Sequence, residues 1–200
     1  MNLVSIIHWA GGLFAFTTLV IVLYGIWRGT QRGAGATTGK TGAWSRSALV
    51  YFGLTAVFVF LAWLGWRQIP VKLSALLRAG MLIGGSLLYF PGLAFLLWGR
   101  LALGRNYFVS TSQGAQLLAG QQMVTGGPYA IVRHPMYVGL ILAAWGALLI
   151  YFTWTALYFA AVSPFVLKRV AKEEQLLAAE FGAEWQAYAR RVPAFFPRIR

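Results

Sequence analysis

The chain has 200 residues, of which 59% are hydrophobic, 16% aromatic and only 10% charged. Soluble domains carry about 25% charged residues, so this composition excludes an ordinary soluble protein and predicts an integral membrane protein. The sequence contains no cysteine, which excludes disulfides and cysteine-ligated metal sites. The net charge of +13 lies at the ends of apolar stretches rather than along one face. It therefore indicates anionic membrane lipids as partners and argues against nucleic-acid binding.

Three uncharged stretches in the first half of the chain predict membrane-spanning helices. They cover residues 1–27, 47–66 and 79–98, and each has at least the about 20 residues that cross a hydrocarbon core. Tryptophans near their ends are typical of the membrane–water interface. Residues 100–122 are too polar to span, and predict a partly helical segment on the membrane surface.

Residues 135–167 form a run of 33 uncharged residues. A single helix of that length would be about 50 Å long, whereas the hydrocarbon core is about 30 Å thick. The aromatic cluster at residues 151–154 is therefore predicted to mark a turn at the far interface, so that the run folds into a tight pair of short helices. This hairpin would supply the fourth and fifth spans, and would bring its two ends together on one side of the membrane.

The segment from Lys168 to Arg191 contains all four acidic residues of the protein. Apolar side chains recur in it at helical spacing, which predicts an amphipathic helix lying against the membrane or the protein core. The residues of this stripe are Phe181, Trp185, Tyr188 and Val192. The predicted fold class for residues 1–200 is thus a single all-α polytopic membrane domain. It has five transmembrane helices, of which residues 1–99 supply three, and a C-terminal amphipathic helix.

The basic residues predict the orientation of the chain. Five spans place fourteen of the 17 lysines and arginines on the side that carries the C-terminus, and three on the other. Because cytoplasmic loops are enriched in basic residues, we expect the C-terminus and residues 126–139 in the cytoplasm. The protein would lie in the inner or plasma membrane if its source is prokaryotic.

Residues 126–139 are the stretch of this apolar chain that is richest in polar side chains able to form a functional site. They open with a Gly-Gly-Pro turn and carry Arg133 and His134 directly before Pro135, which is well placed to begin a helix. The predicted hairpin would bring these residues to the same membrane face as a second polar group after it. The residues that would meet are Tyr129, Arg133, His134 and Tyr137 on one side, and Arg169, Glu173 and Glu174 on the other.

This cluster combines hydrogen-bond donors with carboxylate acceptors, which is the chemistry that a zwitterionic small cofactor requires. Two alternatives weigh against that interpretation. Arg169 and Glu173 are spaced i, i+4, and could form only an ordinary interfacial salt bridge. A metal site is not predicted, because one histidine with two adjacent glutamates does not make a ligand set.

The motifs resemble the isoprenylcysteine carboxyl methyltransferase family, whose C-terminal motif is shared with phospholipid methyltransferases. The likeness covers residues 100–197 and combines Leu103-Gly104-Arg105-Asn106, the run from Met123 to Gly139, and Arg169 with the distant Glu173-Glu174 pair. It implies that residues 100–200 form a methyltransferase core that binds S-adenosylmethionine at the cytoplasmic face. The residues implied to bind this cofactor are Gln121, Gln122, Met123, Val124, Tyr129, His134, Pro135, Met136, Tyr137, Glu173 and Glu174.

The resemblance also implies Arg169 and His134 as catalytic residues, with Arg169 facing a lipophilic or lipidated methyl acceptor. A prenylcysteine-type carboxylate is the first hypothesis, since a carboxylate is ionised near neutral pH and needs no general base. A phospholipid amine or a small thiol is the alternative; either would need a base, for which His134 or a glutamate is the candidate. Two further classes stay open: a membrane reductase that uses NADPH, and a membrane protein without enzymatic activity.

Overall fold

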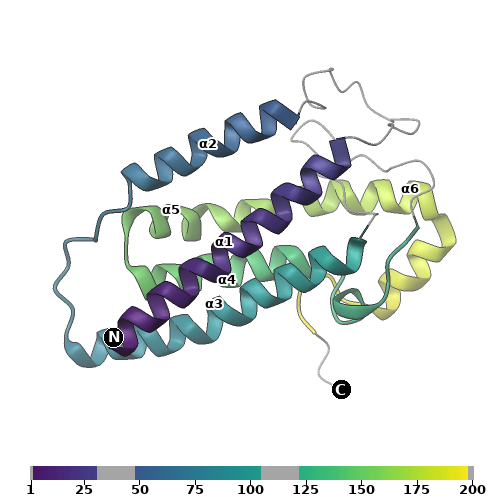
Figure 1. Cartoon of the computed structure of the whole chain (residues 1–200). Helices are drawn as coiled ribbons and strands as arrows, with labels where there is room; N and C mark the ends of the chain where they lie inside the picture. Colours follow the sequence, from purple (N-terminus) through teal and green to yellow (C-terminus); the bar gives the residue numbers. More distant parts are fainter. Residues whose placement is uncertain (1, 31–47, 105–121, 198–200) are drawn as a thin grey trace.

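The computed structural model describes residues 2–30, 48–104 and 122–197. In these ranges all the regular secondary structure is helical, apart from one isolated β-bridge between Gln68 and Thr153. Figure 1 shows most of the helices running roughly along one long direction, with a bent helix and the C-terminus gathered at one end. The helices are α1 (Leu3–Thr30), α2 (Ala48–Leu64), α3 (Ala75–Leu103), α4 (Pro135–Tyr151), α5 (Trp154–Val162) and α6 (Leu167–Arg191), with the 3-10 turns η3 (Gly127–Ala130) and η4 (Ser163–Val166).

Each of the five apolar stretches forms a helix, but not all of these helices are long enough to cross a membrane. Within the described ranges, α1 over Leu3–Gly25 and α3 over Ala75–Leu103 are long and apolar enough to cross a membrane, whereas Phe52–Leu64 and Pro135–Tyr151 are shorter apolar helices. The structure therefore supports the prediction that these stretches are helical, but it does not confirm that all five cross a membrane. Helix α3 contains the predicted third span and extends beyond both of its ends, so that Arg100 lies within the helix.

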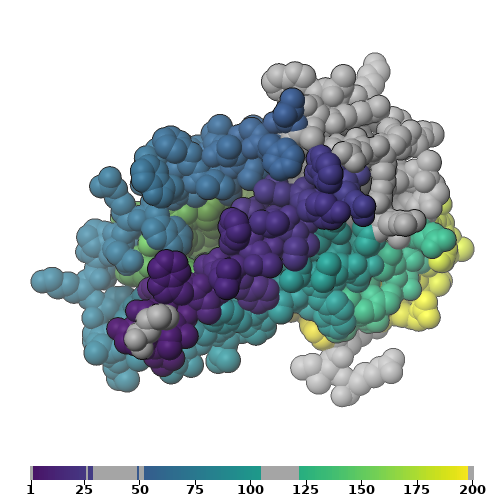
Figure 2. All heavy atoms as spheres, in the orientation of Figure 1, coloured from purple at the N-terminus to yellow at the C-terminus, as the bar shows by residue number. Residues whose placement is uncertain are grey.

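The outer helices present apolar side chains to the surroundings. Figure 2 shows α1 lying across one face of the molecule, with α2 beside it. On α1, Trp9, Leu13 and Phe16 expose between 64% and 75% of their surface. Exposed apolar area of this extent is typical of a surface in contact with lipid or a partner protein.

The predicted hairpin is present, and its turn lies at the predicted aromatic cluster. Helix α4 ends at Tyr151 and α5 begins at Trp154. Phe152 reverses the chain with left-handed backbone angles (φ 50°, ψ 48°), and the Thr153 hydroxyl accepts a hydrogen bond from the Ala156 N–H to cap α5. The connection from α2 to α3 pairs with this turn, since Ile69 N–H donates to the Phe152 carbonyl at 3.1 Å.

Glycines allow α3 and α4 to pack unusually closely. Residues 85, 92 and 99 on α3 and residues 139 and 146 on α4 are glycines spaced by seven, so each set lies along one face of its helix. A Cβ atom added to Gly139 would lie 2.5 Å from the Leu96 backbone nitrogen, and one added to Gly146 would lie 2.5 Å from the Tyr89 nitrogen. The two backbones are therefore in direct contact. This close packing against α3 fixes the position of the start of α4.

Helix α6 is amphipathic as predicted, but it is bent. Gly182 has φ 49° and ψ −117°, which breaks the helical path, so two helical pieces meet there at an angle (Figure 1). Trp185 and Tyr188 of the predicted apolar stripe are buried, 6% and 3% exposed. The Tyr188 hydroxyl donates to the Tyr129 carbonyl at 2.7 Å, which attaches the second half of α6 to the η3 turn.

Candidate functional site

The Gly-Gly-Pro turn positions the polar stretch at the start of α4. Gly127 has φ 60°, a backbone conformation that glycine adopts without strain, and it is the first residue of the η3 turn. The turn buries Tyr129, whose hydroxyl donates to the Gly99 carbonyl of α3 at 3.4 Å. Pro135 is the first residue of α4, as the sequence predicted, and His134 is its N-cap. His134 is thus held directly outside the end of an apolar helix.

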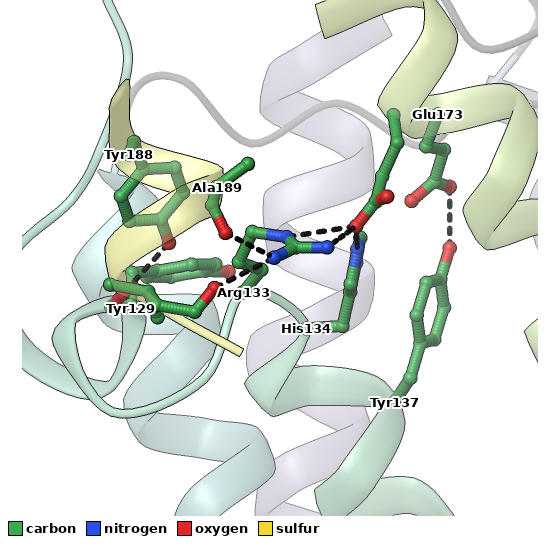
Figure 3. A network of polar contacts seen from close by, with 9 residues as sticks. Tyr129, Arg133, His134, Tyr137, Glu173, Tyr188 and Ala189 are labelled. Carbon is green, nitrogen blue, oxygen red and sulfur yellow. Dashed lines mark hydrogen bonds and ion pairs between the residues drawn. The ribbon is translucent and has the colours of Figure 1, made fainter. Parts of the chain in front are cut away.

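Arg133 is surrounded by acceptors from this same chain (Figure 3). Its Nε and Nη2 donate to Glu174 Oε1 at 2.9 and 2.7 Å. Its Nη1 donates to the carbonyls of Ala189 and Val192 at 3.0 and 2.7 Å. The Trp185 ring lies 5.8 Å from the guanidinium carbon, within the range of a cation–π contact. One side chain therefore joins both halves of the bent α6 to the loop before α4.

His134 shares the same carboxylate oxygen. Its Nε2 lies 2.9 Å from Glu174 Oε1, and the residue is only 7% exposed. Burial lowers the pKa of His134 below its ordinary value, and the opposing pull of Glu174 does not overcome this effect. Burial alone would raise the pKa of Glu174, but the hydrogen bonds from His134 and Arg133 outweigh it and hold that pKa below the ordinary value. Glu174 is therefore ionised and His134 neutral near pH 7.

A second pair lies beside the first. The Tyr137 hydroxyl donates to Glu173 Oε1, again joining the first turn of α4 to α6 (Figure 3). Both residues are half-buried. A carboxylate has about four lone-pair positions and can accept several hydrogen bonds at once. The two pairs form a polar cluster at the end of the molecule where α4 begins.

The C-terminal tail closes one side of this cluster, a feature that the sequence reasoning missed. The backbone N–H groups of Arg133 and His134 donate to the carbonyls of Pro193 and Ala194 at 2.8 and 3.1 Å. The Phe195 ring centre lies 5.6 Å from the imidazole, and the Tyr137 ring 5.8 Å from it. No periodic pattern could have revealed this pairing; the only signal was Pro193, which marks the end of α6.

The structure brings most of the predicted residues together at one end of the hairpin. Arg133 and Glu174 bind one another, and Arg133 also binds two neighbouring backbone carbonyls; the role of Glu174 in binding the cofactor stays a prediction. Gln122, Met123 and Val124 lie in a segment without regular secondary structure that leads into the Gly-Gly-Pro turn. Gln121 lies outside the described residues. Arg169 is half-buried on α6, one turn before Glu173, and the buried Pro135 and half-buried Met136 pack near Gly99.

The geometry defines a class of protein: a helical domain of the membrane type in which a helical hairpin carries a polar cluster at its open end. The cluster contains two carboxylates, a histidine and a tyrosine. The sequence profile of the phospholipid methyltransferase family matches residues 81–184, more than half of the chain. The protein therefore belongs to the phospholipid methyltransferase family. The matched range runs from α3 to the second half of α6, and includes both pairs of the polar cluster.

Individual relatives differ in their named activities. Methanethiol S-methyltransferase 2 of Bradyrhizobium diazoefficiens is 35% identical over 156 residues, which are 74% of this chain and 59% of that protein. Protein-S-isoprenylcysteine O-methyltransferase of Schizosaccharomyces pombe is 39% identical over 38% of this chain and 34% of its own length. A Delta(14)-sterol reductase of Mus musculus is 40% identical over 37% of this chain and 18% of its own length. The chain thus spans less than two thirds of the length of each of these relatives.

Proposed function

We propose that this protein is a membrane-integral methyltransferase that transfers a methyl group from S-adenosylmethionine to a lipophilic acceptor. The observation that carries the proposal is the paired arrangement of His134 with Glu174 and Tyr137 with Glu173 at the open end of the hairpin. This arrangement lies inside the range that matches the family profile. Two named classes of methyltransferase among the relatives support the same reaction type.

The residues of the cluster fit a cofactor of this chemistry. S-adenosylmethionine carries ribose hydroxyls and an amino group that need acceptors, a carboxylate that needs donors, and a sulfonium that supplies an electrophilic methyl group. Glu173 offers the acceptor, because its carboxylate is half-buried and held in place by the Tyr137 hydroxyl. Arg169, one helical turn away, offers a planar donor for a carboxylate. Holding two reactants in line supplies much of the rate of a displacement reaction, so positioning is the main task of these side chains.

The acceptor is proposed to enter from the lipid phase. In this proposal the five apolar helices sit in the bilayer with the polar cluster at the cytoplasmic face, as the fourteen-to-three distribution of basic residues favours. A prenylcysteine-type carboxylate, oriented by Arg169, is one acceptor class, and the isoprenylcysteine methyltransferase relative supports it. A thiol is the second, supported by the relative that aligns with 74% of this chain.

Binding of radiolabelled S-adenosylmethionine to the purified protein in detergent micelles tests the proposal. We expect saturable binding that Glu173→Ala weakens at least tenfold. Glu184→Ala is the matched control, since Glu184 is an exposed carboxylate on the same helix, and it should bind like the wild type. Saturable binding of NADPH with no binding of S-adenosylmethionine would instead support a reductase, and failure to bind either would support a protein without enzymatic activity.

A further inference from the structure

The hydrogen bonds around His134 determine which of its ring nitrogens carries a proton. Glu174 Oε1 lies 2.9 Å from His134 Nε2, and the same oxygen accepts from Arg133 Nε and Nη2. An oxygen that faces a permanent cation is ionised and can only accept hydrogen bonds. The imidazole must therefore be the donor in this contact, and its proton lies on Nε2. This tautomer leaves the lone pair on Nδ1.

The contact with Glu174 engages Nε2 and leaves the other ring nitrogen, Nδ1, outside it. Nδ1 makes no hydrogen bond to any part of the chain that the structure describes. The titratable and charged groups that face this ring are Glu174 and Glu173 of α6, Arg133 of the preceding loop and Tyr137 of α4. Because burial keeps the pKa of the imidazole below its ordinary value, the ring is neutral near pH 7 and Nδ1 is unprotonated. An unprotonated histidine nitrogen has the lone pair that a general base needs.

We propose that His134 Nδ1 is the general base for a protic acceptor, and that this acceptor is a thiol. The inference rests on the proposed methyltransferase function and selects the substrate class of that same site. The thiol S–H bond breaks and its proton moves to Nδ1, while the sulfur forms a bond to the methyl carbon. The bond from that carbon to the sulfonium sulfur breaks, and its electron pair stays on the leaving sulfur, which becomes a neutral thioether. Glu174 balances the charge of the imidazolium until the proton passes to water.

The acidity of each possible acceptor decides among them. A carboxylic acid has a pKa of about 4 and is ionised near neutral pH, so a base would have no task. An amine held as an ammonium has a pKa of about 10, roughly four units above that of an ordinary imidazole. A thiol has a pKa of about 8.5, only about two units above that of an ordinary imidazole, so proton transfer from a thiol to the imidazole is about a hundredfold less unfavourable than transfer from an ammonium. A neutral buried histidine therefore matches a thiol best.

Glu174 and Arg133 act as positioning residues in this scheme. Glu174 holds the proton on Nε2 and favours the imidazolium that forms, and Arg133 holds Glu174 in its ionised state with two hydrogen bonds. Because Glu174 raises the pKa of His134 against the effect of burial, removing its charge should lower that pKa further.

The tautomer can be tested without any reaction. In ¹⁵N-histidine NMR of the purified protein, the His134→Gln variant assigns the signals of His134 against those of His8. At neutral pH we expect a protonated Nε2 and an unprotonated Nδ1. A proton on Nδ1, in either the other tautomer or the imidazolium, would overturn the proposal.

The reaction is tested with methyl-labelled S-adenosylmethionine and three probes: 1-hexanethiol, N-acetyl-S-farnesylcysteine and phosphatidylethanolamine vesicles. We expect methylation of the thiol, with a rate that falls at acid pH as His134 is protonated. His134→Gln keeps a donor for Glu174 but removes the base, so thiol turnover measured at saturating S-adenosylmethionine should fall about 10²–10⁴-fold. Glu174→Gln should move the acid limb of the pH profile to lower pH, whereas Glu184→Gln should leave it in place.

The possible failures are distinguishable. Absence of S-adenosylmethionine binding by the wild type would refute the methyltransferase proposal itself, and the thiol inference with it. Binding of the cofactor with methylation of only the farnesylcysteine carboxylate, or only of the lipid amine, would overturn the thiol inference alone. Unchanged thiol turnover in His134→Gln would overturn the assignment of the base.

Discussion

Replacement of Arg133 by alanine should destabilise the protein strongly, because this side chain joins three segments. It donates four hydrogen bonds, two to the Glu174 carboxylate and two to backbone carbonyls near the end of α6. Hydrogen bonds to charged groups contribute about 1.5–3 kcal/mol each, but they are not additive. Removing one partner of a buried ion pair costs about 3–5 kcal/mol. Arg133 and Glu174 side chains are 13% and 26% exposed, so solvent screening reduces this figure to its lower end, about 3 kcal/mol.

Thermal unfolding in detergent micelles measures this effect. For a chain of this size, 1 kcal/mol shifts Tm by about 2–4 °C, so Arg133→Ala should lower Tm by about 6–12 °C. Arg133→Lys keeps the charge but lacks the planar fork, and should lie between the alanine variant and the wild type. Arg190→Ala removes an exposed cation from the last turn of α6, and should change the free energy of unfolding by less than about 0.5 kcal/mol.

A loss of less than about 1 kcal/mol for Arg133→Ala would refute this reasoning, since that is the value of an exposed pair. A double-mutant cycle with Glu174→Gln separates the pair from the two carbonyl contacts. We expect a coupling energy above about 1 kcal/mol, with a residual loss in Arg133→Ala that Glu174→Gln does not share. Additive losses would show that the guanidinium and the carboxylate act independently.

Three further predictions concern packing, backbone and pH. Gly146→Ala should destabilise by about 1–3 kcal/mol, because the new Cβ would lie 2.5 Å from a backbone nitrogen of α3; Gly84→Ala, which meets nothing within 4 Å, is the matched control for chemical denaturation and should be neutral or stabilising. Gly182→Ala should cost about 1–3 kcal/mol through backbone strain alone, and restoration of stability by D-alanine in a semisynthetic chain would verify that cause. The pKa of His134 and that of Glu174 are both lowered in the folded protein, so the unfolded chain binds more protons and stability should fall as pH drops below about 6.5. Thermal unfolding from pH 7 to pH 4 should show this fall, with a smaller slope in His134→Gln; an equal slope would contradict it.

The sequence was sufficient to predict the hairpin and the meeting of its two ends. A run of 33 uncharged residues is too long for one crossing, and its aromatic cluster marked the turn that the structure has between Tyr151 and Trp154. Once the chain reverses there, His134 and Glu174 must lie at the same end of the molecule. That step used only helix length and membrane thickness, which are independent of side-chain detail.

The internal use of Arg133 was not predictable from spacing. Its two carbonyl acceptors, at Ala189 and Val192, reach the guanidinium only because α6 bends at Gly182. A bend of this kind depends on one glycine with left-handed angles, and glycine in a helical pattern does not by itself indicate a break. The close contact of α3 with α4 did leave a signal, the spacing of their glycines by seven, which sequence reasoning overlooked.

The two adjacent glutamates illustrate how helix geometry separates roles that composition cannot. Consecutive residues of a helix point about 100° apart, so Glu173 and Glu174 cannot face the same neighbours. Glu174 faces the loop, where Arg133 and His134 occupy one of its oxygens with three donors. Glu173 faces the first turn of α4 and meets Tyr137. Because Glu174 binds the loop while Glu173 faces the first turn of α4, the register of α6 matches the proposed division between a positioning residue and a cofactor-binding residue.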